Sequence, residues 1–236
     1  MQYAVPARPF VSAAMPNSLS ATLRVAVLLS GRGSNLQALI DASQAQDYPV
    51  EIVHVVSNSP DAPGLTRAQE AGIATTVLNH REFASREAFD EAVNAVLIGC
   101  RAELVCLAGF MRILTEGFVD AWKDRLLNIH PSLLPAFKGL DAQQQAIDAG
   151  AKLAGCSVHF VRLGMDEGPI IAQAAVPVLA EDDAESLSAR ILIEEHRVYP
   201  MVVRLIAEGR VTVSRERVLI DGANATSGVM SNPAVD

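Results

Sequence analysis

Short apolar runs alternate along the chain with stretches in which apolar residues recur at helical spacing. The runs predict strands at 23–29, 50–56, 74–78, 104–108, 157–161 and 170–178, and a further strand that includes Leu126 and Leu127. Between the runs lie helical patterns, such as the one formed by Leu36, Leu39 and Ile40. This alternation predicts an α/β domain with a mostly parallel central sheet and helices on both faces.

The C-terminal part of the pattern departs from a parallel arrangement. The connection between the strands predicted at 157–161 and 170–178 is short, and a parallel pair would need a long crossover. We therefore expect antiparallel C-terminal strands. The range 183–208 is helical in pattern, and Pro200 is expected to kink or divide that helix. The β-rich segment 211–220 predicts a small hairpin.

Polar residues mark the starts of three predicted helices. Ser85, Thr115 and Asp141 each stand just before a helical pattern, at the N-cap position. Gln144 follows Asp141 at the spacing of a capping box, so we expect it to act as the reciprocal partner.

One structured domain is expected over residues 23–222, because no linker or internal repeat interrupts the pattern. Residues 1–22 contain prolines and no continuous apolar core, which predicts a flexible extension and not a secretory signal. Met15 lies just before the first strand, so both Met1 and Met15 are candidate starts. The small and polar residues 223–236 predict a flexible tail.

The charge of the chain limits its partners. A net charge of −8 without a basic run argues against nucleic-acid binding, but it permits a small anionic substrate at a local site. No apolar run is long enough to span a membrane.

Cys100, Cys106 and Cys156 lack metal or redox spacing, which fits a reducing compartment. We expect a cytoplasmic protein that acts on small molecules, as a monomer or homodimer.

The stretch from Leu126 to Pro135 holds the strongest chemical signal. Pro131 cannot continue a strand, so the strand should end before it. Alternation along the strand then places Asn128 and His130 on one face and Ile129 on the other. An amide and an imidazole therefore project together from a strand end, where open α/β sheets bind their ligands.

A glycine-rich turn follows the first strand. Ser-Gly-Arg-Gly-Ser-Asn at 30–35 separates that strand from a helix, an arrangement that offers backbone N–H groups to a phosphate. Leu36 stands in place of the third glycine of a dinucleotide motif, and the second strand ends without an acidic residue. A single phosphate fits this turn better than a dinucleotide, and a plain tight turn is the alternative.

Two further loops carry candidate ligand-binding residues. The loop 109–114 is apolar and follows a buried strand, which is typical of a pocket wall, although Ile113 and Leu114 taken singly also fit core packing. The loop 162–169 holds two adjacent carboxylates, Asp166 and Glu167, between glycines that permit close approach to a ligand. The residues alone do not choose between the two carboxylates.

Asn-Ile-His-Pro-Ser-Leu-Leu-Pro at 128–135 resembles the signature of the folate-dependent formyltransferases. The resemblance covers about 23–222, and the Gly-Ser-Asn turn makes the chain most similar to the members that formylate glycinamide ribonucleotide in de novo purine biosynthesis. It implies a single-domain, Rossmann-like formyltransferase fold. It also implies 10-formyltetrahydrofolate as the co-substrate.

The resemblance assigns roles to the residues that match the family pattern. It implies that Asn128, His130 and Asp166 are catalytic and that no metal ion takes part. Glycinamide ribonucleotide is expected to bind Gly33, Ser34, Asn35 and Glu195, with its phosphate on the turn. The folate is expected to bind Arg86, Met111, Arg112, Ile113, Leu114, Asn128, Arg162, Leu163, Gly164, Met165 and Asp166.

The sequence departs from the family pattern at two places. The family commonly has His-Thr-His where this chain has Asp141-Ala142-Gln143, and a glutamine where it has Leu192. The first departure removes the two histidines of the family pattern near the site, and the second removes one possible polar contact.

Four alternatives compete with formyl transfer to an amine. Two reuse the same pocket: a formyltetrahydrofolate hydrolase, or an inactive folate- or nucleotide-binding module. A nucleophilic triad of Ser132, His130 and Asp166 lacks the nucleophile-elbow context of such enzymes. A metal site of His130, His159 and Asp166 lacks the spacing of known ligand pairs.

Overall fold

The computed structural model describes residues 22–222 and 231–232, which include a seven-stranded sheet in the order β3-β2-β1-β4-β5-β6-β7. The expected N-terminal extension and C-terminal tail lie almost wholly outside these residues. The strands are β1 (Leu23–Leu29), β2 (Val50–Ser57), β3 (Thr75–Val77), β4 (Leu104–Leu107), β5 (Leu126–His130), β6 (Leu153–Phe160) and β7 (Ile170–Pro177). Strands β1 to β5 pair in parallel, whereas β5-β6 and β6-β7 are antiparallel. The prediction of a mixed sheet is confirmed.

Strand β6 begins four residues earlier than the apolar pattern predicted. Its first residues pair with β7, from Leu153 opposite Pro177 to Cys156 opposite Ala174. The segment Ala-Gly-Cys has weak intrinsic strand preference, so the pattern did not mark it as a strand. Pairing with β7 decides its conformation.

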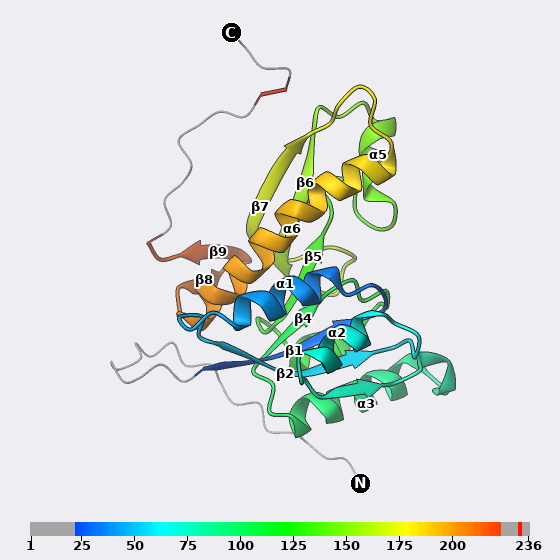
Figure 1. Cartoon of the computed structure of the whole chain (residues 1–236), viewed down its shortest axis with the longest axis vertical. Helices are drawn as coiled ribbons and strands as arrows, with labels where there is room; N and C mark the ends of the chain where they lie inside the picture. Colours follow the sequence, from blue (N-terminus) through cyan, green and yellow to red (C-terminus); the bar gives the residue numbers. More distant parts are fainter. Residues whose placement is uncertain (1–21, 223–230, 233–236) are drawn as a thin grey trace.

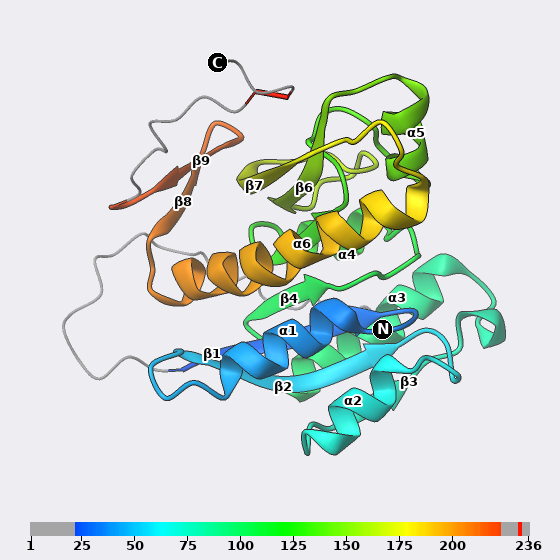
Figure 2. The same cartoon turned by 45° about the horizontal axis from the view of Figure 1, so that its top comes forward.

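Helices cover both faces of the sheet (Figures 1 and 2). They are α1 (Ser34–Ser43), α2 (Gly64–Glu70), α3 (Arg86–Gly99), α4 (Glu116–Ala121), α5 (Ala142–Asp148) and α6 (Ala184–Ala207), with a 3₁₀ turn at His80–Glu82. Val25 and Val27 of β1 pack with α1, α2 and α6, whereas Ala26 and Leu28 pack with α3 and α4. Alternate residues of this central strand therefore supply two separate cores.

The small hairpin predicted at the C-terminal end is present as β8 (Val211–Ser214) and β9 (Arg217–Ile220). It follows α6, and β9 lies beside β7, outside the main sheet (Figure 2). No helix in the described ranges is long and apolar enough to cross a membrane.

Two of the three predicted helix caps are confirmed. The Ser85 hydroxyl accepts from the N–H of Ala88, and the Thr115 hydroxyl accepts from that of Phe118. The capping box at Asp141 is wrong. Asp141 has φ 56°, where its carboxylate makes no capping hydrogen bond, because an N-cap side chain reaches the helix from an extended backbone. Gln144 instead donates to Asp148.

Pro200 was predicted to kink or divide this helix, and α6 is a single helix through Pro200, so the division does not occur. Tertiary contacts hold this part of the helix in place. The buried Tyr199 hydroxyl donates to the Leu107 carbonyl of β4 at 3.0 Å, and the Tyr48 hydroxyl donates to the Pro200 carbonyl at 2.8 Å. Packing outweighs the intrinsic cost of a proline inside a helix.

The glycine turn after β1 is packed directly against the start of α2. The Gly64 N–H donates to the Gly31 carbonyl at 3.1 Å. Gly33 has φ 71°, and a Cβ atom at this position would lie 2.6 Å from Gly64 Cα. Both the backbone conformation and the close approach therefore require glycine at position 33.

Gly33→Ala is expected to lower the free energy of unfolding by about 1–3 kcal/mol or more, because the side chain adds backbone strain and a clash. Urea unfolding of the variant measures this loss. Gly31→Ala is the matched control, since a Cβ atom there meets nothing within 4 Å. Equal stability of the two variants would contradict the packing described for this turn.

Candidate active site

The carboxylate of Asp166 lies at the centre of the candidate site. Its Oδ1 atom is 3.4 Å from Nδ1 of His130 and accepts a long hydrogen bond of 3.5 Å from Nδ2 of Asn128. Its Oδ2 atom accepts from the backbone N–H of Gly139 at 2.7 Å. The carboxyl end of β5 and the loop between β6 and β7 thus bring together the three residues predicted to be catalytic.

The His130 ring is enclosed by the protein. Its side chain is 7% exposed and that of Asp166 is 13% exposed, so attraction between them is screened less than at the surface. Nε2 of His130 lies 2.9 Å from the carbonyl oxygen of Phe137. Because both ring nitrogens face oxygen acceptors, the ring donates on both sides when it is protonated.

His159 fixes the amide of Asn128. The two residues are opposite each other across β5 and β6, with Asn128 Nδ2 at 3.2 Å from His159 Nε2. Burial lowers the pKa of His159, so the ring is neutral, and its Nδ1 faces the Phe160 carbonyl at 3.1 Å. The ring therefore donates from Nδ1 and accepts at Nε2 from the Asn128 amide. Sequence reasoning considered His159 only for a metal site, because this role depends on the β5-β6 register.

The two rival catalytic arrangements find no support in the contacts. Ser132 is buried, and its hydroxyl donates to the Ala136 carbonyl at 2.6 Å and makes no hydrogen bond to His130, so the triad is not assembled. Within residues 22–222 and 231–232, no group of three or more His, Cys, Asp or Glu side chains is arranged to hold a metal ion.

A second polar pair joins the glycine turn to α6. Nδ2 of Asn35 donates to Oε2 of Glu195 at 2.7 Å, although the residues are 160 positions apart. Both are nine-tenths buried, and burial raises the pKa of the Glu195 carboxyl, against the opposing effect of the Asn35 hydrogen bond. The Asn35 Oδ1 atom is buried without a partner among the described residues. The structure therefore brings together the residues predicted to bind the ribonucleotide.

The first turn of α1 supplies backbone donors beside this pair. The first hydrogen bond of the helix runs from the Gln37 N–H to the Gly33 carbonyl, so the N–H groups of residues 34–36 precede the helical ladder. Unpaired N–H groups at a helix N-terminus suit a phosphate.

The residues predicted to bind folate fall into exposed and buried groups. Met111, Ile113, Leu163 and Met165 are more than half exposed, which is unusual for large apolar side chains and is typical of a surface that a ligand covers. Leu114 belongs instead to the core beneath α3 and α4.

The three predicted folate arginines differ in their surroundings. Arg86 is exposed in the first turn of α3. Arg112 is partly buried, with its guanidinium 5.7 Å from the centre of the Phe89 ring. Arg162 is engaged by Asp124 and Glu216, so its charge is already paired within the protein.

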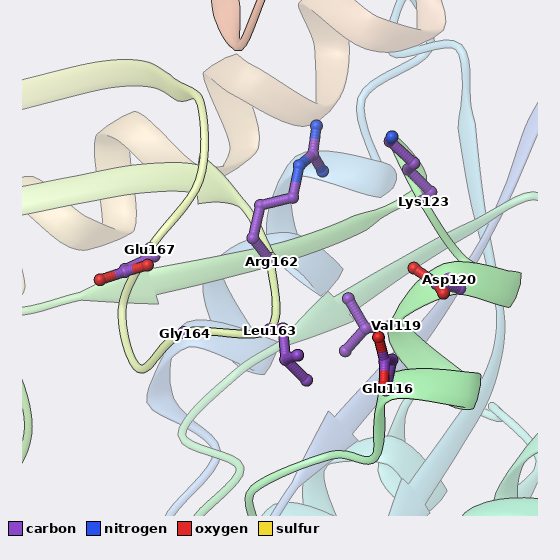
Figure 3. Close-up of a pocket in the computed structure, with 8 residues that line it drawn as sticks. All are labelled: Glu116, Val119, Asp120, Lys123, Arg162, Leu163, Gly164 and Glu167. Atoms are coloured by element: carbon purple, nitrogen blue, oxygen red, sulfur yellow. The ribbon is translucent and has the colours of Figure 1, made fainter.

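A cavity of about 300 Å³ lies between α4 and the β6–β7 loop (Figure 3). The loop contributes residues that the sequence singled out, including Arg162, Leu163 and Gly164. The opposite wall holds Glu116, Val119, Asp120 and Lys123, which sequence reasoning missed. Their pattern is that of an ordinary surface helix, and only the packing of the sheet places them opposite the loop.

Comparisons with known proteins agree with this geometry. A sequence model of the family described as formyl transferase matches residues 23–203. Phosphoribosylglycinamide formyltransferase of Escherichia coli is 45% identical over 200 residues, covering 85% of this chain and 94% of the relative. The trifunctional purine biosynthetic protein adenosine-3 of Drosophila melanogaster is 51% identical over 195 residues, and the match covers 82% of this chain but only 14% of that protein.

The solved structures show the same fold. The crystal structure of glycinamide ribonucleotide transformylase 1 from Symbiobacterium toebii superimposes with a TM-score of 0.84 at 48% identity, covering 89% of this chain and 99% of the other. Phosphoribosylglycinamide formyltransferase from Anaplasma phagocytophilum gives a TM-score of 0.80 at 50% identity, covering 86% and 96%. The chain belongs to the formyl transferase family.

Proposed function

We propose that the protein transfers the formyl group of 10-formyltetrahydrofolate to the amine of glycinamide ribonucleotide, a step of de novo purine biosynthesis. Family membership and the names of the relatives support this reaction. The observation that carries it is the convergence of Asp166, His130 and Asn128 around one position at the carboxyl end of β5.

The reaction proceeds by direct attack of the substrate amine on the formyl carbon. The tetrahedral intermediate carries negative charge on the former carbonyl oxygen, and Nδ2 of Asn128 donates a hydrogen bond to it in place of the long 3.5 Å hydrogen bond to Asp166. A preorganised donor of this kind lowers the barrier by about 3–4 kcal/mol. No covalent bond to the enzyme is formed.

Proton movement completes the transfer. The folate nitrogen gains a proton as the carbon–nitrogen bond breaks, and the proton that the attacking amine loses replaces it on the histidine ring, so the ring ends the reaction as it began. His130 supplies the proton or hydrogen bond on the leaving side from Nε2, which exchanges its contact with the Phe137 carbonyl for one with the folate nitrogen. Asp166 stabilises the charged ring and fixes its orientation, and the N–H of Gly139 holds the carboxylate in place.

The two substrates occupy neighbouring parts of the site. The phosphate of the ribonucleotide binds the N–H groups of the turn at Gly33, Ser34 and Asn35, and Glu195 contacts the rest of that substrate. The folate binds along residues 111–114 and the β6–β7 loop, and the exposed Arg86 faces its carboxylates. The exposed apolar side chains of these loops and the cavity between the loop and α4 support this placement.

We further propose a cytoplasmic protein that acts as a monomer or homodimer on these small molecules. The substrate-side departures, Asp141-Ala142-Gln143 and Leu192, make no hydrogen bond to the side chains of Asp166, His130 or Asn128. Segment 141–143 nevertheless begins only two residues after Gly139, so it borders the site.

One assay separates this proposal from its alternatives. The protein is incubated with 10-formyltetrahydrofolate, with and without glycinamide ribonucleotide, and loss of the formyl donor is followed. We expect loss only when the ribonucleotide is present. Equal loss without the amine would indicate a hydrolase, and no loss in either case would indicate a binding module.

Asp166→Asn and His130→Ala are each expected to lower the transfer rate by about a hundredfold or more, because each removes part of the charge and proton relay. Steady-state kinetics measure the loss, and circular dichroism checks that the fold is intact. Glu181→Gln is the control, since it neutralises an exposed carboxylate outside the site. Near-normal turnover of the Asp166 or His130 variant would remove that residue from the mechanism.

Glu195→Gln is expected to raise the KM for glycinamide ribonucleotide by about tenfold or more, because a buried charge-assisted contact to that substrate is lost. The same change should stabilise the free protein at neutral pH. Burial raises the pKa of Glu195, so folding disfavours its charged form, and wild-type stability falls as the pH rises through that pKa.

The stability gain of Glu195→Gln should shrink as the pH falls below the range of an ordinary carboxyl, where the wild-type group is protonated in both states. Urea unfolding at several pH values tests the sign. A variant less stable than wild type at neutral pH, or a gain that does not depend on pH, would contradict the account of this buried carboxyl.

A further inference from the structure

The side chain of Arg162 links three separate elements near the candidate site. Its Nη2 atom donates to Asp124 at 2.6 Å, in the turn between α4 and β5. Its Nε atom donates to Glu216 Oε2 at 2.7 Å, in the turn between β8 and β9, and Nη2 also reaches Oε1 of Glu216 at 3.3 Å. The Arg162 side chain is only 17% exposed.

Arg162 is also the first residue of the loop that carries Asp166. The N–H of Arg162 donates to the Glu167 carbonyl at 3.1 Å, and the N–H of Glu167 donates to the Gly164 carbonyl at 3.2 Å. At Gly168, φ is 127° and a Cβ atom would collide with the Phe160 carbonyl. These contacts close the loop on itself, so holding Arg162 fixes the position of the whole loop.

The opposite side of the loop is held independently. The N–H of Gly139 donates to Asp166, and the Lys138 ammonium donates to Glu167 at 2.8 Å. The carboxylate of Asp166 therefore sits between two anchors. One anchor is the segment 138–139, and the other is the guanidinium of Arg162.

The β8–β9 turn is shaped to reach Arg162. Arg215 and Glu216 both have positive φ, 49° and 57°, as in the tight two-residue turns that connect the strands of a β-hairpin. The hydrogen bond from Arg162 lowers the pKa of Glu216, so the carboxylate is charged at neutral pH.

A single exposed ion pair contributes little to stability. The contacts of Arg162 differ from such a pair in two respects. The guanidinium binds Glu216 through two of its nitrogens, and it also binds a second carboxylate on another element. When a planar guanidinium binds a carboxylate through two nitrogens, the relative orientation of the two groups is fixed as well as the distance between them. The contact therefore restricts where the loop can lie.

We propose that Arg162 is a positioning residue for formyl transfer. The C-terminal hairpin, through the contact of Glu216 with Arg162, holds the loop that carries Asp166 in place, and we call this contact the latch. The inference rests on the proposed role of Asp166 in the reaction. The same loop lines the cavity beside α4, so the latch acts on both the catalytic carboxylate and the folate side of the site. It does not act on the glycine turn that binds the other substrate.

The test variant is Glu216→Gln, which removes one charge at an exposed position. Asp221→Asn is the matched control, because Asp221 is an exposed carboxylate directly after β9 and is not among the hydrogen-bond partners of Arg162. Glu216→Gln is expected to lower kcat and to raise the KM for the formyl donor, so that kcat/KM for this donor falls by about three- to tenfold. The KM for glycinamide ribonucleotide should not change. Asp221→Asn should match wild type.

A double-variant comparison shows whether Glu216 acts through Arg162. In the Arg162→Met background, Glu216→Gln should have almost no further effect on kcat/KM, because the contact is already absent. An equal loss in both backgrounds would show that Glu216 acts by another route and would overturn the latch.

Hydrogen exchange tests the latch without any substrate. Glu216→Gln should speed exchange in residues 162–168, whereas Asp221→Asn should not. Unchanged exchange in this loop would overturn the proposal even if the enzyme is active. Faster exchange in a protein that transfers no formyl group would instead support the latch and refute the proposed function.

Discussion

The carboxylate of Asp166 is the constraint on which the rest of the site depends. It accepts a hydrogen bond from the Gly139 N–H and faces both the imidazole of His130 and the amide of Asn128. A largely enclosed carboxylate needs such partners, since burying it alone would cost several kcal/mol. The loop that carries Asp166, the end of β5 and the segment after Phe137 are therefore fixed relative to one another by one charged group.

The mixed sheet explains how one domain holds two different kinds of binding site. Its parallel half ends β1 in a glycine turn and a helix N-terminus, which suits a phosphate. Its antiparallel half brings the β6–β7 loop back over the end of β5, where Asn128 and His130 project. The Asn35–Glu195 pair connects the turn to α6 beneath the site.

The sequence predicted what depends on local periodicity. Alternation along β5 placed Asn128 and His130 together, because the side chains of a strand repeat every second residue. The choice of Asp166 over Glu167 came from family resemblance alone, and its position beside His130 agrees with that choice. The predicted cap at Asp141 and the predicted division at Pro200 do not occur, because a left-handed backbone at Asp141 and tertiary packing around Pro200 outweigh local preference. The contacts of His159 and Glu216 depend on strand register and on docking of the hairpin, which no local pattern encodes.

The central claim is that the formyl carbon is transferred at the point where Asn128, His130 and Asp166 meet. A crystal structure with glycinamide ribonucleotide and a non-transferable analogue of the formyl donor measures this directly. We expect the oxygen that replaces the formyl oxygen to lie about 3 Å from Nδ2 of Asn128, with the phosphate on the N–H groups of residues 33–35. An analogue bound with its formyl group away from these three side chains, while both substrates occupy the protein, would contradict the account.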